Sequence, residues 1–272
     1  MSVRPTLFGI VNITADSFSD GGRYLAPEAA LAHSRALARD GADVLDLGAA
    51  SSNPDALPVE AKVEIERLAP VVAALQAERK AVSIDSFSPE VQRWALGRRV
   101  DYLNDVAGFA QTELYPALAA SNARLIVMHS VQGGAGTSRI SVPPDEIMDC
   151  ILRFFENRLA ALEKSGVARH RLIVDPGMGF FLGNDPQASH AVLRGIGTLK
   201  SAFGLPVLVS VSRKSFLRTL TGRKPRESGA ASLAAELFAA RAGADYLRTH
   251  DPGAARDALL VSEVLDGGGR LA

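Results

Sequence analysis

Short apolar runs alternate with longer segments along the whole chain. The runs are rich in valine, isoleucine and leucine, and turn-forming residues lie near their ends. Parallel strands that are covered by helices on both faces have this nearly continuous apolar character. We therefore predict strands at residues 7–13, 43–47, 81–85, 102–106, 124–129, 171–175, 207–211 and 245–249.

The segments between these runs have the periodicity of amphipathic helices. Their apolar residues recur at i, i+3, i+4 and i+7, and several segments begin at a proline or an acidic residue. Gly41, Gly166 and Gly243 each follow such a segment and precede a predicted strand, the usual place of a helix-ending glycine. The clearest predicted helices cover residues 27–40, 61–76, 145–164 and 227–242.

The order of these elements predicts an α/β fold. Eight strand–helix units in 272 residues fit a single TIM (β/α)8 barrel, and no Pro/Ser-rich linker or charge block divides the chain. We therefore predict one domain over residues 1–272. A doubly wound open sheet is the alternative, because alternation alone does not show that the sheet closes.

The composition argues against several other classes. The chain has 30 basic and 30 acidic residues, whereas a nucleic-acid-binding domain usually has a basic excess. Its single cysteine, Cys150, cannot form an internal disulfide and fits a reducing compartment. Residues 1–5 lack the features of a secretion signal, and no apolar run is long enough to span a bilayer. We expect a cytoplasmic protein that binds neither nucleic acid nor membrane.

Every predicted strand ends in a polar or ionisable group. In a TIM barrel, the carboxyl ends of the strands and the loops that follow them build the active site. Burying so many unpaired polar groups at one end of a barrel is costly, so a functional site explains them better than solvation does. The groups are Asn12, Asp46, Asp85, Asn104, His129, Asp175, Ser212 with Lys214, and Arg248 with His250.

The chemistry of these groups narrows the ligand. Asp85, Asn104 and Asp175 offer acceptors, and the asparagine adds an amide donor, which suits a flat heterocycle with an amino group and ring N–H. A second set offers only donors when charged and lies near the last two strands, where barrels often bind phosphate. This set is Lys214, Arg248 and His250. The alternative is that the acidic and basic groups merely pair with each other.

Seven sequence blocks resemble those of the dihydropteroate synthases, in the order of that family. The most specific are FGIVNITADSFSDGG at residues 8–22 and SRKS at residues 212–215. The others are SIDS at 83–86, ND at 104–105, MH at 128–129, DPGMG at 175–179 and RTH at 248–250. The resemblance covers residues 6–252 and implies a (β/α)8-barrel transferase of folate biosynthesis. Such an enzyme condenses 6-hydroxymethyl-7,8-dihydropterin pyrophosphate with p-aminobenzoate to give 7,8-dihydropteroate and pyrophosphate.

The resemblance also implies roles for individual residues. The pterin-binding residues would be Asp85, Asn104, Met128, Asp175 and Lys214, of which Asp85, Asp175 and Lys214 would be catalytic. The pyrophosphate-binding residues would be Asn12, Arg248 and His250, with Mg²⁺ bound at Asn12. The aminobenzoate-binding residues would be Ser52, Phe181, Ser212 and Arg213. Residues 13–24 and 49–59 would form two mobile loops, and the family tendency implies a homodimer.

The implied mechanism follows from charge. Pyrophosphate leaves the pterin to give a cationic intermediate, which the arylamine attacks. The two aspartates can stabilise the cation, whereas Mg²⁺ and the basic groups can stabilise the departing anion. No covalent nucleophile is required, and closure of the two loops would exclude water.

The sequence departs from the family pattern on the aminobenzoate side only. Ala15 stands where a proline is usual, Asn53 replaces an arginine and Asp55 replaces a glycine. After Asp175 the chain has FFLG at residues 180–183, where many members have Phe-Gly-Lys. This pattern resembles the acquired, sulfonamide-insensitive members, and it predicts that Phe181 clashes with a sulfonyl group. The alternative is drift in surface loops.

Two other functions remain open from the sequence. A pterin-binding barrel that passes methyl groups from a folate to a corrinoid partner could share the acidic pocket, but it would not need the basic set. A non-catalytic paralogue would be expected to have lost part of that set or of the first block, and both are present.

Overall fold

The computed structural model describes residues 4–14, 26–51, 57–132 and 140–267. Within these residues, eight parallel strands form one sheet in the order β6-β5-β4-β3-β2-β1-β8-β7. The strands are β1 (Thr6–Asn12), β2 (Val44–Gly48), β3 (Ala81–Asp85), β4 (Tyr102–Asp105), β5 (Arg124–Met128), β6 (Leu172–Asp175), β7 (Leu208–Val209) and β8 (Tyr246–Thr249).

The sheet closes on itself between β6 and β7. Val174 and Val207 form an isolated parallel bridge, and the Val174 N–H donates to the Pro206 carbonyl at 3.0 Å. On the other side of the barrel, β1 pairs with β8, so the first and last strands are neighbours. The predicted single-domain TIM barrel is therefore confirmed, and the alternative of an open doubly wound sheet is wrong.

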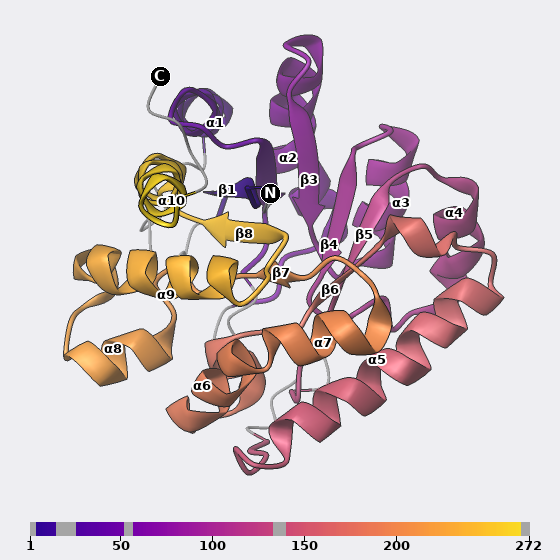
Figure 1. Ribbon diagram of the computed structural model, residues 1–272. Coiled ribbons are helices and arrows are strands. Elements are labelled where there is room, and N and C mark those ends of the chain that lie inside the picture. Colours follow the sequence, from indigo (N-terminus) through magenta and orange to yellow (C-terminus); the bar gives the residue numbers. More distant parts are fainter. Residues whose placement is uncertain (1–3, 15–25, 52–56, 133–139, 268–272) are drawn as a thin grey trace.

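Helices surround the strands (Figure 1) and begin and end largely where the sequence predicts. In α1, a proline occupies the first turn, and Gly41 follows the last turn with a φ of +108°. Gly166 and Gly243 have the same left-handed conformation after α5 and α9. The helices are α1 (Pro27–Arg39), α2 (Ala61–Ala77), α3 (Pro89–Gly97), α4 (Tyr115–Ala120), α5 (Ile147–Lys164), α6 (Pro186–Arg194), α7 (Ile196–Phe203), α8 (Ser215–Thr221), α9 (Gly229–Arg241) and α10 (Pro252–Leu265).

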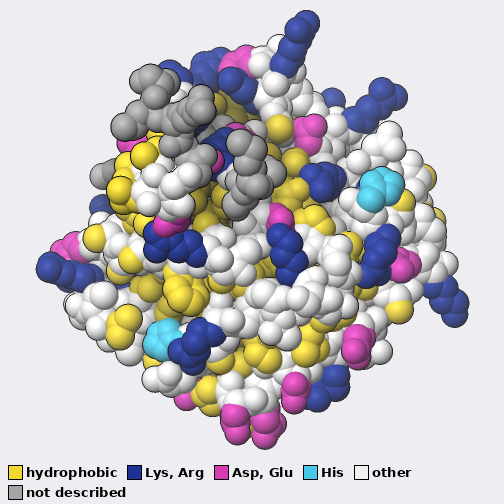
Figure 2. All heavy atoms as spheres, in the orientation of Figure 1, with side chains coloured by type: hydrophobic (Ala, Val, Ile, Leu, Met, Phe, Trp, Pro, Cys, Tyr) yellow, Lys and Arg dark blue, Asp and Glu magenta, His cyan; other side chains and the backbone are white. Residues whose placement is uncertain are grey.

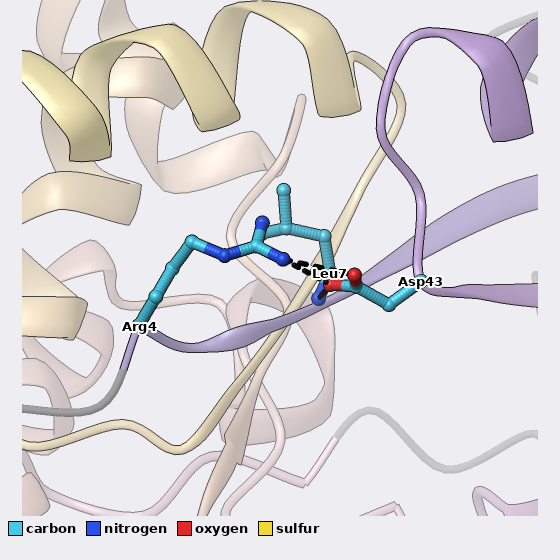
Figure 3. Close-up of polar contacts among 3 residues, drawn as sticks. All are labelled: Arg4, Leu7 and Asp43. Atoms are coloured by element: carbon cyan, nitrogen blue, oxygen red, sulfur yellow. Dashed lines mark hydrogen bonds and ion pairs between the residues drawn. The ribbon is translucent and has the colours of Figure 1, made fainter. Parts of the chain in front are cut away.

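An aspartate fixes the start of β2 against β1 (Figure 3). The Asp43 carboxylate accepts the backbone N–H of Leu7 at 2.8 Å and forms an ion pair with Arg4 at 2.9 Å. Asp101, before β4, accepts the Val82 N–H, and Asp245, before β8, accepts the Val207 N–H, each at 2.9 Å. These bonds set the register at the amino-terminal end of the barrel.

The barrel interior is apolar at this amino-terminal end. The ring of Phe8 contacts Tyr102 and Tyr246 edge-on, with centroids 5.0 and 5.7 Å apart. Val44, Ile126, Ile173 and Leu208 belong to the same cluster, and Ala81 packs against it. Because side chains two positions apart on a strand share a face, the next inward positions can be read from this layer. They are polar on six strands, namely Asp46, Ser83, Asn104, Asp175, Ser210 and Arg248.

The surface carries charges of both signs. Figure 2 shows lysine and arginine side chains interspersed with aspartate and glutamate side chains over the face in view. This distribution agrees with the equal numbers of basic and acidic residues in the chain. Among the described residues, no helix has the length and apolar character needed to cross a lipid bilayer.

Candidate active site

A hollow of about 530 Å³ opens at the carboxyl ends of the strands. Most of the predicted site residues line it, and they come from β1, β3, β8, the 3-10 turn at Gly179–Leu182 and the loop after β7. These lining residues are Asn12, Asp85, Phe181, Ser212, Arg213, Lys214, Arg248 and His250. Ser52, with Asn53 and Asp55, lies outside the described residues.

Three predicted pterin-binding residues lie beneath the hollow rather than on its wall. Asn104, Met128 and Asp175 are buried, with exposures of 3%, 5% and 2%. Sheet register nevertheless brings them to the same end of the barrel, because Asn104 pairs with Asp85 and Met128 pairs with Asp175. The Asn104 side-chain oxygen is buried without a hydrogen-bond partner among the described residues. A ligand N–H that entered from the hollow would satisfy it.

Arg248 joins two carboxylates inside the barrel. Its Nε donates to Asp46 Oδ2 at 2.5 Å, and its Nη2 donates to Asp85 Oδ2 at 2.6 Å. The side-chain exposures are 14% for the arginine, none for Asp46 and 18% for Asp85. Burial by itself would lower the pKa of Arg248, but the two carboxylates raise it above its ordinary value. The guanidinium therefore stays charged.

Burial sets the protonation of the other charged groups in this cluster. It raises the pKa of Asp85, against the opposing effects of Arg248 and Lys214. Burial also raises the pKa of Asp175 to about 6, against a backbone N–H bond from Gly177 and the same two cations. Burial and the nearby Arg248 lower the pKa of Lys214 to about 8, against the two aspartates. Perturbed pKa values of this kind gather at functional sites.

His250 lies between the charged cluster and the loop after β7. Its ring Nδ1 is 3.0 Å from the Ser212 hydroxyl oxygen, which also accepts the His250 backbone N–H at 3.2 Å. Burial lowers the pKa of His250 well below its ordinary value, and nearby cations, Arg213 first among them, lower it further. The imidazole is therefore neutral at neutral pH and offers one N–H donor. An arriving anion would favour its protonation.

Two turns, each with a residue of positive φ, border the hollow on the Phe181 side. Gly177 has a φ of +72°, and a β-carbon there would lie 2.4 Å from the His129 carbonyl oxygen, so only glycine fits. Arg213 adopts a φ of +59°, which is uncommon for a residue with a side chain, and its N–H donates to Ser232 at 2.9 Å. The Lys214 ammonium lies 4.9 Å from the centroid of the Phe181 ring, within the range of a cation–π interaction.

One strand-end group does not belong to the site. His129 follows β5 and packs against Phe154 of α5, with ring centroids 5.2 Å apart. Its Nδ1 is 3.1 Å from the Pro176 carbonyl oxygen, and burial lowers its pKa to about 4. A neutral His129 therefore supports the turn after β6 from behind. The inference that all strand-end groups share one ligand site is wrong at this position, because side chains alternate and Met128 takes the inward place.

The site also contains three residues that the sequence analysis did not single out, and Asp46, which it named only as a strand-end group. Thr14, Ser51 and Ser210 line the hollow, and Asp46 binds Arg248 below it. The hydroxyl residues carry no distinctive pattern. Asp46 does carry a signal, because a carboxylate in the middle of the buried strand sequence VLDLG needs a partner.

Residues 8–250 match the family described as pterin binding enzyme. The type-2 dihydropteroate synthase of Escherichia coli is 58% identical over 259 residues, which cover 95% of this chain and 95% of that protein. The chain belongs to the dihydropteroate synthase family. The type-3 dihydropteroate synthase of Escherichia coli is 49% identical, with 95% of this chain and 98% of that protein covered.

A solved structure gives the same result. The dihydropteroate synthase of Xanthomonas albilineans in complex with 7,8-dihydropteroate superimposes with a TM-score of 0.82 and 33% identity, covering 98% of this chain and 94% of that one. The resemblance seen in the sequence blocks is thus confirmed. These relatives are synthases, which places the chain with them rather than with corrinoid-linked methyl-transfer barrels.

Proposed function

We propose that this protein condenses 6-hydroxymethyl-7,8-dihydropterin pyrophosphate with p-aminobenzoate to give 7,8-dihydropteroate and pyrophosphate. The observation that carries this proposal is the buried charged cluster at the carboxyl end of the barrel. It combines the acidic groups of Asp85 and Asp175 with the basic groups of Lys214 and Arg248. A cationic intermediate and a departing anion need both kinds of group in one place.

In this proposal the pterin enters the hollow and reaches the layer beneath it. Asp175 accepts from the pterin amino group and ring N–H, and Asn104 contributes the acceptor that has no other partner among the described residues. Met128 provides an apolar contact for the flat ring, and Lys214 donates to a ring acceptor. Asp85 can turn from Arg248 toward the ligand, because its side chain is partly exposed.

The pyrophosphate group lies toward Arg248 and His250 in this proposal. Asn12 lines the same hollow, and among the described residues no group of three or more acidic, histidine or cysteine side chains could hold a metal alone. This donor set fits Mg²⁺ that is carried mainly by the phosphates and water, with the Asn12 amide oxygen as one ligand. When bound, Mg²⁺ would neutralise charge on the leaving group. Chelation with EDTA should then abolish turnover, and added Mg²⁺ should restore it.

The reaction needs no covalent intermediate with the protein. The bond between the pterin methylene carbon and the pyrophosphate oxygen breaks, and the electron pair leaves with pyrophosphate. Positive charge spreads over the pterin, where Asp85 and Asp175 stabilise it, while Arg248 stabilises the anion. The aminobenzoate nitrogen then bonds to the methylene carbon and loses a proton.

The aminobenzoate is proposed to lie beside Phe181, Ser212 and Arg213. These residues line the same hollow, and Arg213 brings a positive charge for the carboxylate. We further propose that the protein discriminates against sulfonamides, because the Phe181 ring would clash with a tetrahedral sulfonyl group but leave room for a flat carboxylate. The cation–π contact of that ring with Lys214 holds it near the site.

The homodimer and the cytoplasmic location are further proposals. Exposed apolar side chains, including Phe238 on α9 and Leu260 and Val261 on α10, support self-association. Light scattering of the purified protein would show a monomer mass if the dimer proposal is wrong. The single free cysteine, Cys150, fits a reducing compartment.

A turnover assay tests the proposed reaction directly. The protein is incubated with the pterin pyrophosphate and p-aminobenzoate, and both 7,8-dihydropteroate and released pyrophosphate are measured. We expect equal amounts of the two products, and no dihydropteroate without aminobenzoate. Binding of the pterin pyrophosphate without turnover would instead indicate a non-catalytic paralogue.

A further inference from the structure

A fully buried aspartate lies on the inner face of β2. Asp46 has no exposed surface, and its Oδ2 accepts from Arg248 Nε at 2.5 Å. Its other oxygen, Oδ1, is buried without a hydrogen-bond partner among the described residues. Since a buried carboxylate needs a compensating partner, the ion pair of Oδ2 with Arg248 is what offsets the burial of Asp46.

The two carboxylates hold Arg248 through different nitrogen atoms of its guanidinium. Asp46 occupies the Nε side from inside the barrel, whereas Asp85 occupies Nη2 and lines the hollow. Asp85 is also the group that the proposed reaction directs toward the pterin. Once Asp85 engages the pterin, its hold on Arg248 weakens, but Asp46 lies too deep to make the same change.

We propose that Asp46 is a positioning residue that keeps Arg248 aimed at the anion subsite while Asp85 serves the pterin. The guanidinium fork allows this, because Nε and the Nη groups can bind separate partners at once. An arginine that is already held loses less side-chain entropy when the anion binds. This inference rests on the proposed function for the identity of the anion, whereas the contact between Asp46 and Arg248 is independent of that function.

A purely structural ion pair is the competing explanation, and the two differ in a measurable way. If Asp46 acts through Arg248, its effect on anion binding disappears once the arginine is removed. If Asp46 only stabilises the barrel, Asp46→Asn lowers Tm but leaves the binding of inorganic pyrophosphate by the folded protein unchanged. A double-mutant cycle separates these cases, because residues that act together have non-additive effects.

The cycle compares the wild type, Asp46→Asn, Arg248→Ala and the double variant. The measurements are kcat/KM for the pterin pyrophosphate, KM for aminobenzoate, and calorimetric binding of inorganic pyrophosphate. We expect Asp46→Asn to lower kcat/KM about tenfold, from lost positioning of one charged contact, and to leave KM for aminobenzoate unchanged. In the Arg248→Ala background, Asp46→Asn should lower kcat/KM no further, because the carboxylate of Asp46 no longer has an arginine to position.

Asp43→Asn is the matched control. Asp43 precedes the same strand and also pairs with an arginine, Arg4 (Figure 3). It lies at the opposite end of the barrel, because it comes before the first residue of β2. We expect this variant to change stability without changing kcat/KM. Should Asp46→Asn fail to fold, Asp46→Ser, which leaves room for water, takes its place in the cycle.

Equal fold-losses from Asp46→Asn in both backgrounds, or an equal rise in KM for both substrates, would overturn the proposal. The measurement of pyrophosphate binding tests the role of Asp46 separately from the proposed function. If the wild type binds pyrophosphate without making dihydropteroate, the synthase proposal fails, while a non-additive binding cycle still supports the role of Asp46.

Discussion

Asp175→Asn should lower activity and raise stability at the same time. Asp175 is 2% exposed, and its Oδ1 accepts the Gly177 N–H at 2.8 Å. An asparagine oxygen can accept the same bond, so the turn after β6 should persist. What the substitution removes is the negative charge.

The loss of charge acts on the two quantities in opposite directions. In the reaction, a charged acceptor at a buried site contributes roughly 1.5–3 kcal/mol, so turnover should fall about tenfold to 150-fold. In folding, burial raises the pKa of Asp175 from 3.8 to about 6. The folded protein therefore binds that proton more tightly than the unfolded chain does, and ionisation at pH 7 destabilises the fold. Since one pKa unit equals about 1.4 kcal/mol, the neutral side chain should recover up to about 3 kcal/mol.

Two measurements on the same preparations check this prediction. Steady-state kinetics gives kcat and kcat/KM, and thermal unfolding at pH 7 and pH 5 gives Tm. We expect the variant to have the higher Tm at pH 7, with a smaller difference at pH 5, where the wild-type carboxyl is largely protonated. A lower Tm at pH 7, or turnover within twofold of the wild type, would refute the assignment of Asp175 as a buried charge that serves the reaction.

Three further predictions concern pH, the anion and the inhibitor. The profile of kcat/KM against pH should be bell-shaped. It should fall below about pH 6 to 7, as the Asp175 and Asp85 carboxylates gain protons, and above about pH 8, as the Lys214 ammonium loses one. A flat profile between pH 5 and 9 would contradict it. Arg248→Ala should weaken binding of the pterin pyrophosphate, measured by calorimetry, at least about tenfold more than it weakens binding of the free pterin, because the charged contact to phosphate is lost. Equal weakening of binding for both ligands would indicate general misfolding. Phe181→Gly should lower the sulfonamide inhibition constant by about two to three orders of magnitude, as expected for relief of a clash of about 3–4 kcal/mol, with little change in KM for aminobenzoate. A parent enzyme that is already inhibited at low micromolar sulfonamide would contradict the proposed discrimination.

The fold could be predicted closely from the sequence because its strands are buried on both faces. Continuous apolar runs located all eight, and for seven of them the predicted limits differ by at most one residue at either end. The seventh strand is the exception. Residues 207–211 read as one strand, but only Leu208–Val209 pair regularly, since the chain turns toward Ser212 and the strained Arg213. Apolar character measures burial and does not show where hydrogen bonding to a neighbour stops.

The sequence predicted which residues form the candidate site better than it predicted their protonation and their contacts. Residue type indicated that Arg248 and His250 are donors, but not that His250 is neutral or that Arg248 is shared between Asp46 and Asp85. Both facts depend on burial and on contacts across the barrel, between residues more than 160 positions apart. The position of His129 shows the same limit, because alternation along β5 turns it toward α5.

The short seventh strand has a consequence for how the barrel opens. Between β6 and β7 the wall is joined by one isolated bridge and the bond from Val174 to Pro206, whereas the other neighbouring strands pair over continuous registers. Asp175 ends one side of this seam, and the loop with Ser212 and Lys214 follows the other. Local opening requires the least free energy where the fewest backbone bonds must break. Amide hydrogens along this seam should therefore exchange with solvent before those of β1 to β3, and a bound pterin that contacts both sides would slow that exchange.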